Sequence, residues 1–127
     1  MTNYIKVFND HFEEFINDVH RLFPQDEDVL TSKNTIISIR KINPKMIVKI
    51  WKTYIVEKYK DKIEAGDIQF FITKDYANDL TDTSNSDKIM QVINRLRDPI
   101  KNMNAENQLK SMKYIQNLTK LSEFCIV

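Results

Sequence analysis

The residues whose types could support catalysis or metal binding are two histidines and one cysteine. His11 and His20 have no cysteine or carboxylate at the paired spacing that zinc sites use, so we interpret them as surface or bundle-edge residues. Cys125 lies among apolar neighbours, which raise the pKa of a thiol and provide no base to activate it. These patterns predict no catalytic residue, no cofactor-binding residue and no metal ligand, and therefore a protein that is not an enzyme.

Nucleotide-binding loops are excluded because Gly66 is the one glycine in the chain. The P-loop, the kinase glycine loop and the dinucleotide-binding fingerprint each need several glycines. Only glycine lets the backbone approach a phosphate group that closely. We therefore expect no kinase, P-loop or Rossmann site.

A stretch of oxygen-bearing side chains could be arranged around calcium: Asp75, Asp79, Asp82, Ser84, Asn85 and Asp87. This stretch lacks the glycine and the distal glutamate of an EF-hand loop. We favour a solvated polar loop over residues 78–87, in which Ser86 or Asp87 caps the next helix.

The strongest functional hint is a candidate basic face, which consists of Arg40, Lys41, Lys45, Lys49 and Lys52. Its last three lysines stack on one side of a helix, where they could neutralise a phosphate backbone. The sequence has no helix-turn-helix spacing, no zinc finger and no aromatic platform on a sheet. We favour the solvated side of an amphipathic helix and keep nucleic-acid binding as the alternative.

The helix that carries these lysines, residues 44–65, has the widest apolar face in the chain and the only tryptophan, Trp51. Asn43 and Pro44 form a helix start, and Gly66 ends the helix. One neighbour cannot cover so broad an apolar arc, so we expect this helix at the centre of a bundle, in contact with two or more others.

The first predicted helix, residues 3–23, places apolar residues at alternating steps of three and four: Ile5, Phe8, Phe12, Phe15, Val19 and Leu22. This is a heptad seam, and Phe8, Phe12 and Phe15 are too bulky to remain in water. The seam is too short for a dependable coiled coil, so we favour packing within the chain. Docking of a partner helix on Phe8, Phe12 and Phe15 is the alternative.

The other segments also have helical patterns. Asp26 caps a helix that reaches about residue 41 and buries Leu30, Ile36, Ile37 and Ile42. Asp67 starts a short helix that packs Ile68, Phe71 and Ile72 inward, with a strand as the alternative over residues 67–76. A helix over residues 88–103 is interrupted late by Pro99, and the last helix, residues 105–124, carries Leu109, Met112, Ile115, Leu118 and Leu121. The predicted fold is all-α: a single-domain compact bundle of five to six helices over residues 1–127.

Composition agrees with one globular domain, because 42% of the 127 residues are hydrophobic and 29% are charged. The net charge is +1, but acidic and basic blocks alternate along the chain, which favours acidic and basic helices that face each other. No apolar run approaches the ~18 residues that a membrane-spanning helix needs. The N-terminus lacks the order of a signal peptide, so we expect an intracellular protein that does not enter a membrane. The oligomeric state stays open.

Two strings carry a resemblance: residues 41–76, which include KINPKMIVKIWK, and residues 107–124, NQLKSMKYIQNLTKLSEF. With residues 86–103 between them, they resemble a family of small proteins encoded by large nucleocytoplasmic DNA viruses of algae and protists. That family brings no assigned chemistry and no catalytic residues. The resemblance implies a viral protein in the cytoplasm of the infected host cell, with packaging in the virion as an open question.

We therefore expect a non-enzymatic protein–protein interaction or structural module of a large DNA virus, with a viral or host protein as partner and a place in the virion as one role. The alternative is a nucleic-acid-associated factor that uses the basic face of the 40–62 region. The two differ in the salt dependence of binding, which is steep for nucleic acid.

Overall fold

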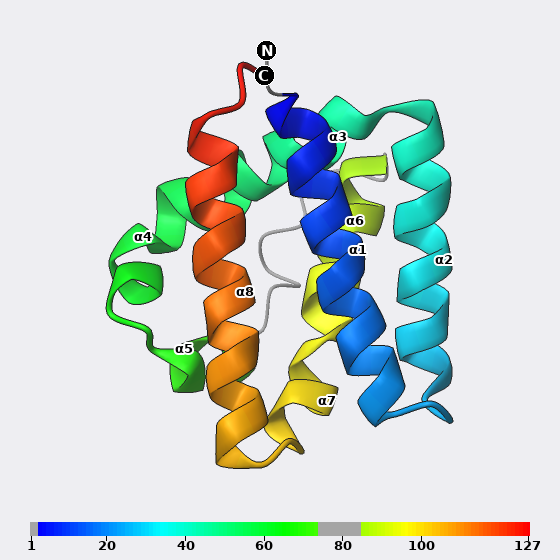
Figure 1. The fold of residues 1–127 in the computed structure, drawn as a ribbon, viewed down its shortest axis with the longest axis vertical. Coiled ribbons are helices and arrows are strands. Elements are labelled where there is room, and N and C mark those ends of the chain that lie inside the picture. Colours follow the sequence, from blue (N-terminus) through cyan, green and yellow to red (C-terminus); the bar gives the residue numbers. More distant parts are fainter. Residues whose placement is uncertain (1–2, 74–84) are drawn as a thin grey trace.

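The computed structural model describes residues 3–73 and 85–127, and within these ranges every regular element is a helix and none is a strand. In chain order the elements are α1 (Tyr4–Leu22), α2 (Glu27–Ile42), α3 (Pro44–Ile50), the π-helix η1 (Trp51–Val56), α4 (Glu57–Glu64), α5 (Ile68–Thr73), α6 (Asn85–Arg95), α7 (Arg97–Lys101) and α8 (Ala105–Glu123). Figure 1 shows α1 between α2 and α8, with all three along the long axis of the molecule. The predicted all-α bundle is confirmed.

Short polar side chains begin the helices where the sequence predicts. Asp26 accepts hydrogen bonds from the backbone N–H groups of Asp28 and Val29, and Asn43 accepts one from the backbone of Met46. These bonds satisfy N–H groups that have no partner inside the helix. Pro44 follows Asn43 in the first turn, where its missing N–H is not needed.

The central helix is formed by α3, η1 and α4, which follow one another without a gap; its middle turn is a π-helix, and it kinks at Tyr59, where φ is −128° and ψ is 20°. Trp51 is 4% exposed, and its ring meets Phe8 and Phe12 edge-on at centroid distances of 6.2 and 5.9 Å. Its Nε1–H donates to Thr119 Oγ1 of α8 at 3.2 Å. The central helix thus contacts both α1 and α8, as predicted, and it ends before Gly66, which has a φ of +69°.

The phenylalanine seam of α1 belongs to the core. Phe8, Phe12 and Phe15 are buried, so packing within the chain is confirmed and these rings do not form a docking surface. Leu22, the last position of the predicted seam, is 42% exposed. A straight helix drifts by about 20° per heptad, and Leu22 also ends α1, so it has rotated away from the neighbouring helices.

The buried face of α2 agrees with the prediction at Ile36, which is fully buried, but differs from it at Leu30 and Ile42. Leu30 is 44% exposed and Ile42 is 80% exposed, whereas the buried residues are Val29, Ser32, Ile36 and Ile39. These four follow steps of three and four, but the polar Ser32 conceals the pattern from a reading of hydrophobicity alone. Leu109 is a similar error, because it lies near the start of α8 and is 67% exposed.

The segment after Gly66 is a helix, so the strand alternative is wrong for the part that the structure describes. Asp67 Oδ1 accepts from the backbone N–H of Phe70 at 3.1 Å, and Phe71 and Ile72 are buried. Of the loop predicted over residues 78–87, residues 78–84 lie outside the described residues, and so do Asp75, Asp79, Asp82 and Ser84 of the calcium alternative.

The α6–α7 segment shows one wrong and one confirmed prediction. Helix α6 already begins at Asn85, so a cap at Ser86 or Asp87 is wrong. The helix breaks between α6 and α7 because Pro99 has no N–H to donate to the carbonyl four residues earlier. The interruption predicted at Pro99 is therefore confirmed.

Candidate partner-binding surface

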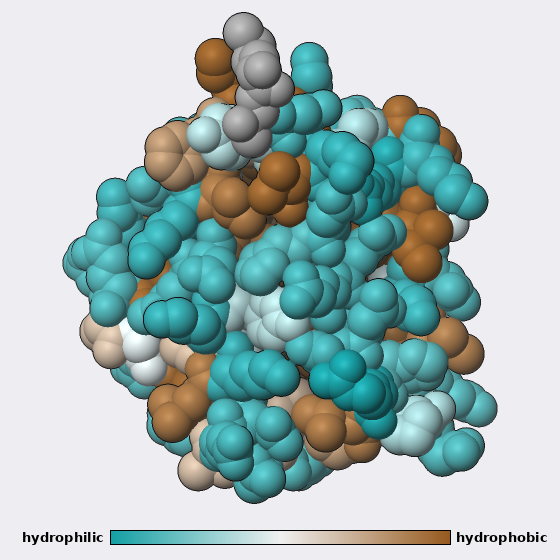
Figure 2. Space-filling view, viewed as in Figure 1, coloured by the Kyte–Doolittle hydropathy of each residue, from teal (hydrophilic) through white to brown (hydrophobic). Residues whose placement is uncertain are grey.

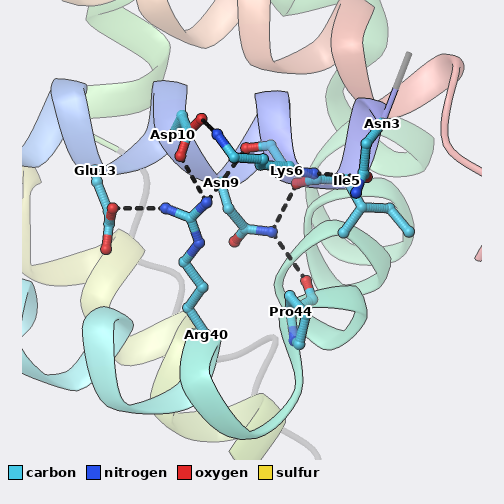
Figure 3. A network of polar contacts seen from close by, with 8 residues as sticks. All are labelled: Asn3, Ile5, Lys6, Asn9, Asp10, Glu13, Arg40 and Pro44. Atoms are coloured by element: carbon cyan, nitrogen blue, oxygen red, sulfur yellow. Dashed lines mark hydrogen bonds and ion pairs between the residues drawn. The ribbon is translucent and has the colours of Figure 1, made fainter. Parts of the chain in front are cut away.

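Arg40 belongs to an ion-pair network between α2 and α1, shown in Figure 3. Its Nη1 donates to Glu13 Oε2 and its Nη2 donates to Asp10 Oδ1, both at 2.6 Å. Hydrogen bonds from Lys6 and from Arg40 lower the pKa of Asp10 below its ordinary value. Arg40 was predicted as part of a basic face, but its guanidinium is 21% exposed and points toward the two carboxylates. That assignment is wrong, and Arg40 joins two helices instead.

Asn9 extends this connection to the central helix. Its Nδ2 donates to the carbonyl oxygens of Ile5 at 2.9 Å and Pro44 at 3.1 Å. The side chain is 1% exposed, although the sequence pattern of α1 assigned no role to it. A buried amide between two helix termini sets where α3 starts relative to α1, and only its position next to Phe8 hinted at burial.

The predicted lysines of α3 and η1 differ in their surroundings. Lys45 and Lys49 are exposed, and within the described residues neither has an acidic partner. Lys52 is half-buried, and its Nζ donates to the carbonyl oxygen of Cys125 at 3.1 Å. Lys41 is exposed at the end of α2. Among residues 3–73 and 85–127, Lys41, Lys45 and Lys49 have no acidic partner, and Lys45 and Lys52 lie beside the C-terminal residues.

Lys45 borders an apolar surface that the two ends of the chain form together. The rings of Tyr4 and Phe124 stack with centroids 5.0 Å apart, and Phe124 is 63% exposed. Ile126 is 95% exposed, and these residues line a groove of about 570 Å³ with Lys45. We name the set Tyr4, Ile5, Lys45, Phe124 and Ile126 the Tyr4–Phe124 surface.

Both figures place this surface at one end of the molecule. The N- and C-termini meet there in Figure 1, and Figure 2 shows apolar side chains gathered at the same upper end. Apolar residues are scattered singly on most protein surfaces, but a contiguous aromatic patch beside unpaired cations is typical of an interaction site. No sequence pattern indicates this patch, because Tyr4 and Phe124 are far apart in the chain.

Cys125 lies beneath this surface and is 4% exposed. Burial raises the pKa of its thiol, while the positive charge of Lys52 acts in the opposite direction. Its Sγ–H donates to the carbonyl oxygen of Leu121 at 3.4 Å. The predicted rise of the thiol pKa is confirmed, and a protonated buried thiol is a poor nucleophile.

Tyr114 brings a second polar cluster together between α8 and α1. Its hydroxyl donates to Asp18 and also contacts Glu14 Oε1 at 3.3 Å. His11 Nδ1 lies 3.6 Å from Glu14 Oε2, and the His11 and Tyr114 rings are 4.9 Å apart. Burial, followed by the hydrogen bond to Asp18, raises the pKa of Tyr114. His20 takes no part in these contacts.

This cluster has no room for a substrate. The cavity beside Asp18 and Tyr114 measures about 30 Å³, whereas ligand pockets are on the order of 300–1,000 Å³. A second cavity of about 40 Å³ lies in the core between Phe12, Trp51 and Phe71 and is lined almost wholly by apolar side chains. Within the described residues no three histidine, cysteine or acidic side chains gather in a way that could hold a metal ion.

None of the described helices is long and apolar enough to cross a bilayer. Comparison of the chain with protein-family models, curated protein sequences and solved structures finds no match.

Proposed function

We propose that this protein is a non-enzymatic helical module that binds another protein through the Tyr4–Phe124 surface. The observation that supports the proposal most is the exposed Tyr4–Phe124 stack beside Lys45, which has no carboxylate partner among the described residues. Aromatic rings are enriched in protein interfaces, and the rim of such interfaces is polar. The fitting partner is a segment that carries apolar side chains with carboxylates next to them.

The exposed area can support specific but modest binding. Full burial of a large apolar side chain stabilises a complex by about 1.5–3 kcal/mol. Tyr4 is 37% exposed and Phe124 is 63% exposed, so each contributes a fraction of that amount, and Ile126 adds nearly its whole side chain. The exposed lysines steer an acidic partner toward the groove more than they increase its final affinity.

The polar clusters away from this surface support a non-enzymatic role. The Arg40 network and the Tyr114 cluster each join two helices, and the cavity beside Tyr114 measures about 30 Å³. The resemblance to proteins of large nucleocytoplasmic DNA viruses supplies the setting of the proposal. In that setting the partner is a viral or host protein in the infected cytoplasm, and a virion component is one form of the same role.

The geometry favours this proposal over nucleic-acid binding by the 40–62 region. Arg40 is paired with two carboxylates, and Lys52 is bonded to the Cys125 carbonyl. Of the candidate basic face, Lys41, Lys45 and Lys49 remain exposed. In the rest of the region Lys60 lies beside Glu64 and Glu123, and Lys58 and Lys62 lie over the rings of Tyr54 and Phe70, so most of its bases already have a contact within the chain.

Site-specific photocrosslinking tests the proposal in the cells that naturally make the protein. A benzophenone side chain replaces Phe124 in one variant and Leu109 in the other. Leu109 is a matched control because it lies at the other end of α8 and is 67% exposed, close to the 63% of Phe124. We expect one discrete protein adduct from position 124, its loss after Lys45→Glu with Lys49→Glu, and no such adduct from position 109.

Three results would count against the proposal. Equal adducts from both positions would show non-specific contact, and an adduct that nuclease removes would show nucleic-acid binding. If a folded Phe124→Ser variant still formed the same protein adduct from a crosslinker at another surface position, the interface would lie on another face.

A further inference from the structure

A second groove lies between α2 and α6, away from the Tyr4–Phe124 surface. Its volume is about 540 Å³. Most of the side chains that line it carry hydrogen-bond donors, and the full lining is Thr31, Asn34, Thr35, Ser38, Ile39, Ile42, Lys88, Gln91 and Arg95. We name it the α2–α6 groove. No sequence pattern brings these residues together, because the whole central helix lies between α2 and α6 in the chain.

The lining of this groove is complementary to an anion. It contains two cations and no acidic residue, although the chain has 18 aspartates and glutamates. Lys88 and Arg95 are exposed, and within the described residues neither forms an ion pair, in contrast to Arg40 and Arg21. The polar side chains of the groove can accept hydrogen bonds from Lys88 and Arg95, but they do not neutralise the two positive charges.

The spacing of the groups suggests a ligand with several separated charges. Lys88 and Arg95 are two helical turns apart on α6, a rise of about 10.5 Å at 1.5 Å per residue. Thr31, Thr35 and Ser38 form a row along one face of α2. Helix α2 packs against α6 and is antiparallel to it (Figure 1). A single phosphate between the two cations would leave most of the hydroxyl row of α2 without a contact, whereas an extended chain of phosphates can follow both cations and that row.

We propose that the α2–α6 groove binds the sugar–phosphate backbone of a single nucleic-acid strand. Lys88 contacts one phosphate, and Arg95 holds another through its planar donor fork. The hydroxyls of Thr31 and Ser38 and the amides of Asn34 and Gln91 can both donate and accept, which suits sugar hydroxyls and base edges. The Thr35 hydroxyl already donates to the Thr31 carbonyl oxygen at 2.8 Å, so it can only accept from a ligand. The groove contains no aromatic side chain for base stacking, so binding is weak and independent of sequence.

An acidic peptide is the competing ligand class, and the lining argues against it. Peptides that bind grooves usually anchor through apolar side chains, which need apolar pockets. Here the apolar lining consists of Ile39, which is buried, and Ile42, which is 80% exposed at the groove edge. The α2–α6 groove and the Tyr4–Phe124 surface share no residue, so a nucleic-acid strand and a protein partner would bind at different places on the molecule.

Fluorescence anisotropy with a labelled 20-nucleotide oligouridylate tests this inference on the full chain. We expect binding at low salt, with log K falling against log salt at a slope of about −1.4 for two neutralised phosphates. The double variant Lys88→Glu, Arg95→Glu should weaken binding at least tenfold. The control variant Lys45→Glu, Lys49→Glu changes the net charge by the same amount on the other surface and should leave binding within about twofold of the wild type. Circular dichroism confirms that both variants are folded.

Each contrary result overturns the inference. No binding at low salt would exclude a strand-binding groove, and an equal loss in both variants would indicate non-specific attraction by the whole protein. Polyglutamate of equal charge that competes as well as unlabelled oligouridylate would assign the groove to acidic peptides. A variant that removes hydroxyls but no charge, Thr31→Val with Thr35→Val, should weaken binding severalfold without a change of salt slope.

Discussion

Replacement of Trp51 by alanine tests the central position of the α3–η1–α4 helix. The indole is 4% exposed, lies edge-on against Phe8 and Phe12, and donates a hydrogen bond to Thr119. These contacts connect the central helix to α1 and α8 in one place. We expect Trp51→Ala to destabilise the fold more than any substitution of an exposed residue.

The magnitude follows from two contributions. Truncation of a buried aromatic side chain to alanine costs about 3–5 kcal/mol, because apolar contacts are lost and a cavity remains. The lost hydrogen bond contributes about 1 kcal/mol of this. The Thr119 hydroxyl still donates to the carbonyl oxygen of Ile115 at 2.9 Å, so no buried donor is left without an acceptor. Trp51→Phe, which keeps most of the ring, should therefore cost about 1–2 kcal/mol.

Equilibrium unfolding in urea, followed by helical circular dichroism, measures both variants against the wild type. The wild-type tryptophan should also emit at the short wavelength of a buried indole and be poorly quenched by acrylamide. A loss below about 1 kcal/mol for Trp51→Ala, or emission typical of an exposed indole, would refute the packing described for this helix.

Three further predictions concern polar groups. Arg40→Met should destabilise the fold. Because the folded pKa of Asp10 is lowered, the wild type should lose stability as the pH falls below about 4. Urea titrations at several pH values should show a smaller loss in the variant. Tyr114 has a raised folded pKa, so its contribution is present below its unfolded pKa of about 10 and is lost at higher pH; in Tyr114→Phe, alkaline unfolding followed by circular dichroism should be less steep. Ser32 Oγ is buried without a partner, whereas Ser122 Oγ donates to a carbonyl at 2.7 Å. Thermal unfolding should therefore show Ser32→Ala neutral or stabilising and Ser122→Ala destabilising by about 1 kcal/mol, and equal effects would contradict this assignment.

Helix boundaries could be predicted because they depend on residues within one turn. Asn43 and Pro44 start the central helix, and Gly66 follows its end with a positive φ that other residues avoid. The side chain of Asp67 bonds a backbone N–H three residues later. Each of these interactions forms between neighbours in the chain, so the local sequence is enough to specify it.

The buried face of a helix was harder to predict, because it depends on the neighbours that cover it. Ser32 is completely buried although it is polar, and Ile42 is 80% exposed although it is apolar. In α2 the contacts with α1 and α6 decide which residues are covered, and hydrophobicity alone predicted Ile36 correctly but Leu30 and Ile42 wrongly.

The sequence by itself determined that the chain is all-helical and where most helices begin and end, because backbone hydrogen bonding and capping are local. Only the tertiary structure decided what the charged and aromatic residues do. Arg40 meets Asp10 across 30 positions of chain, and Tyr4 stacks on Phe124 from the opposite end of the sequence. Ion pairing and ring stacking require direct contact, and contact between distant residues is set by how the helices pack, not by the order in which they follow one another.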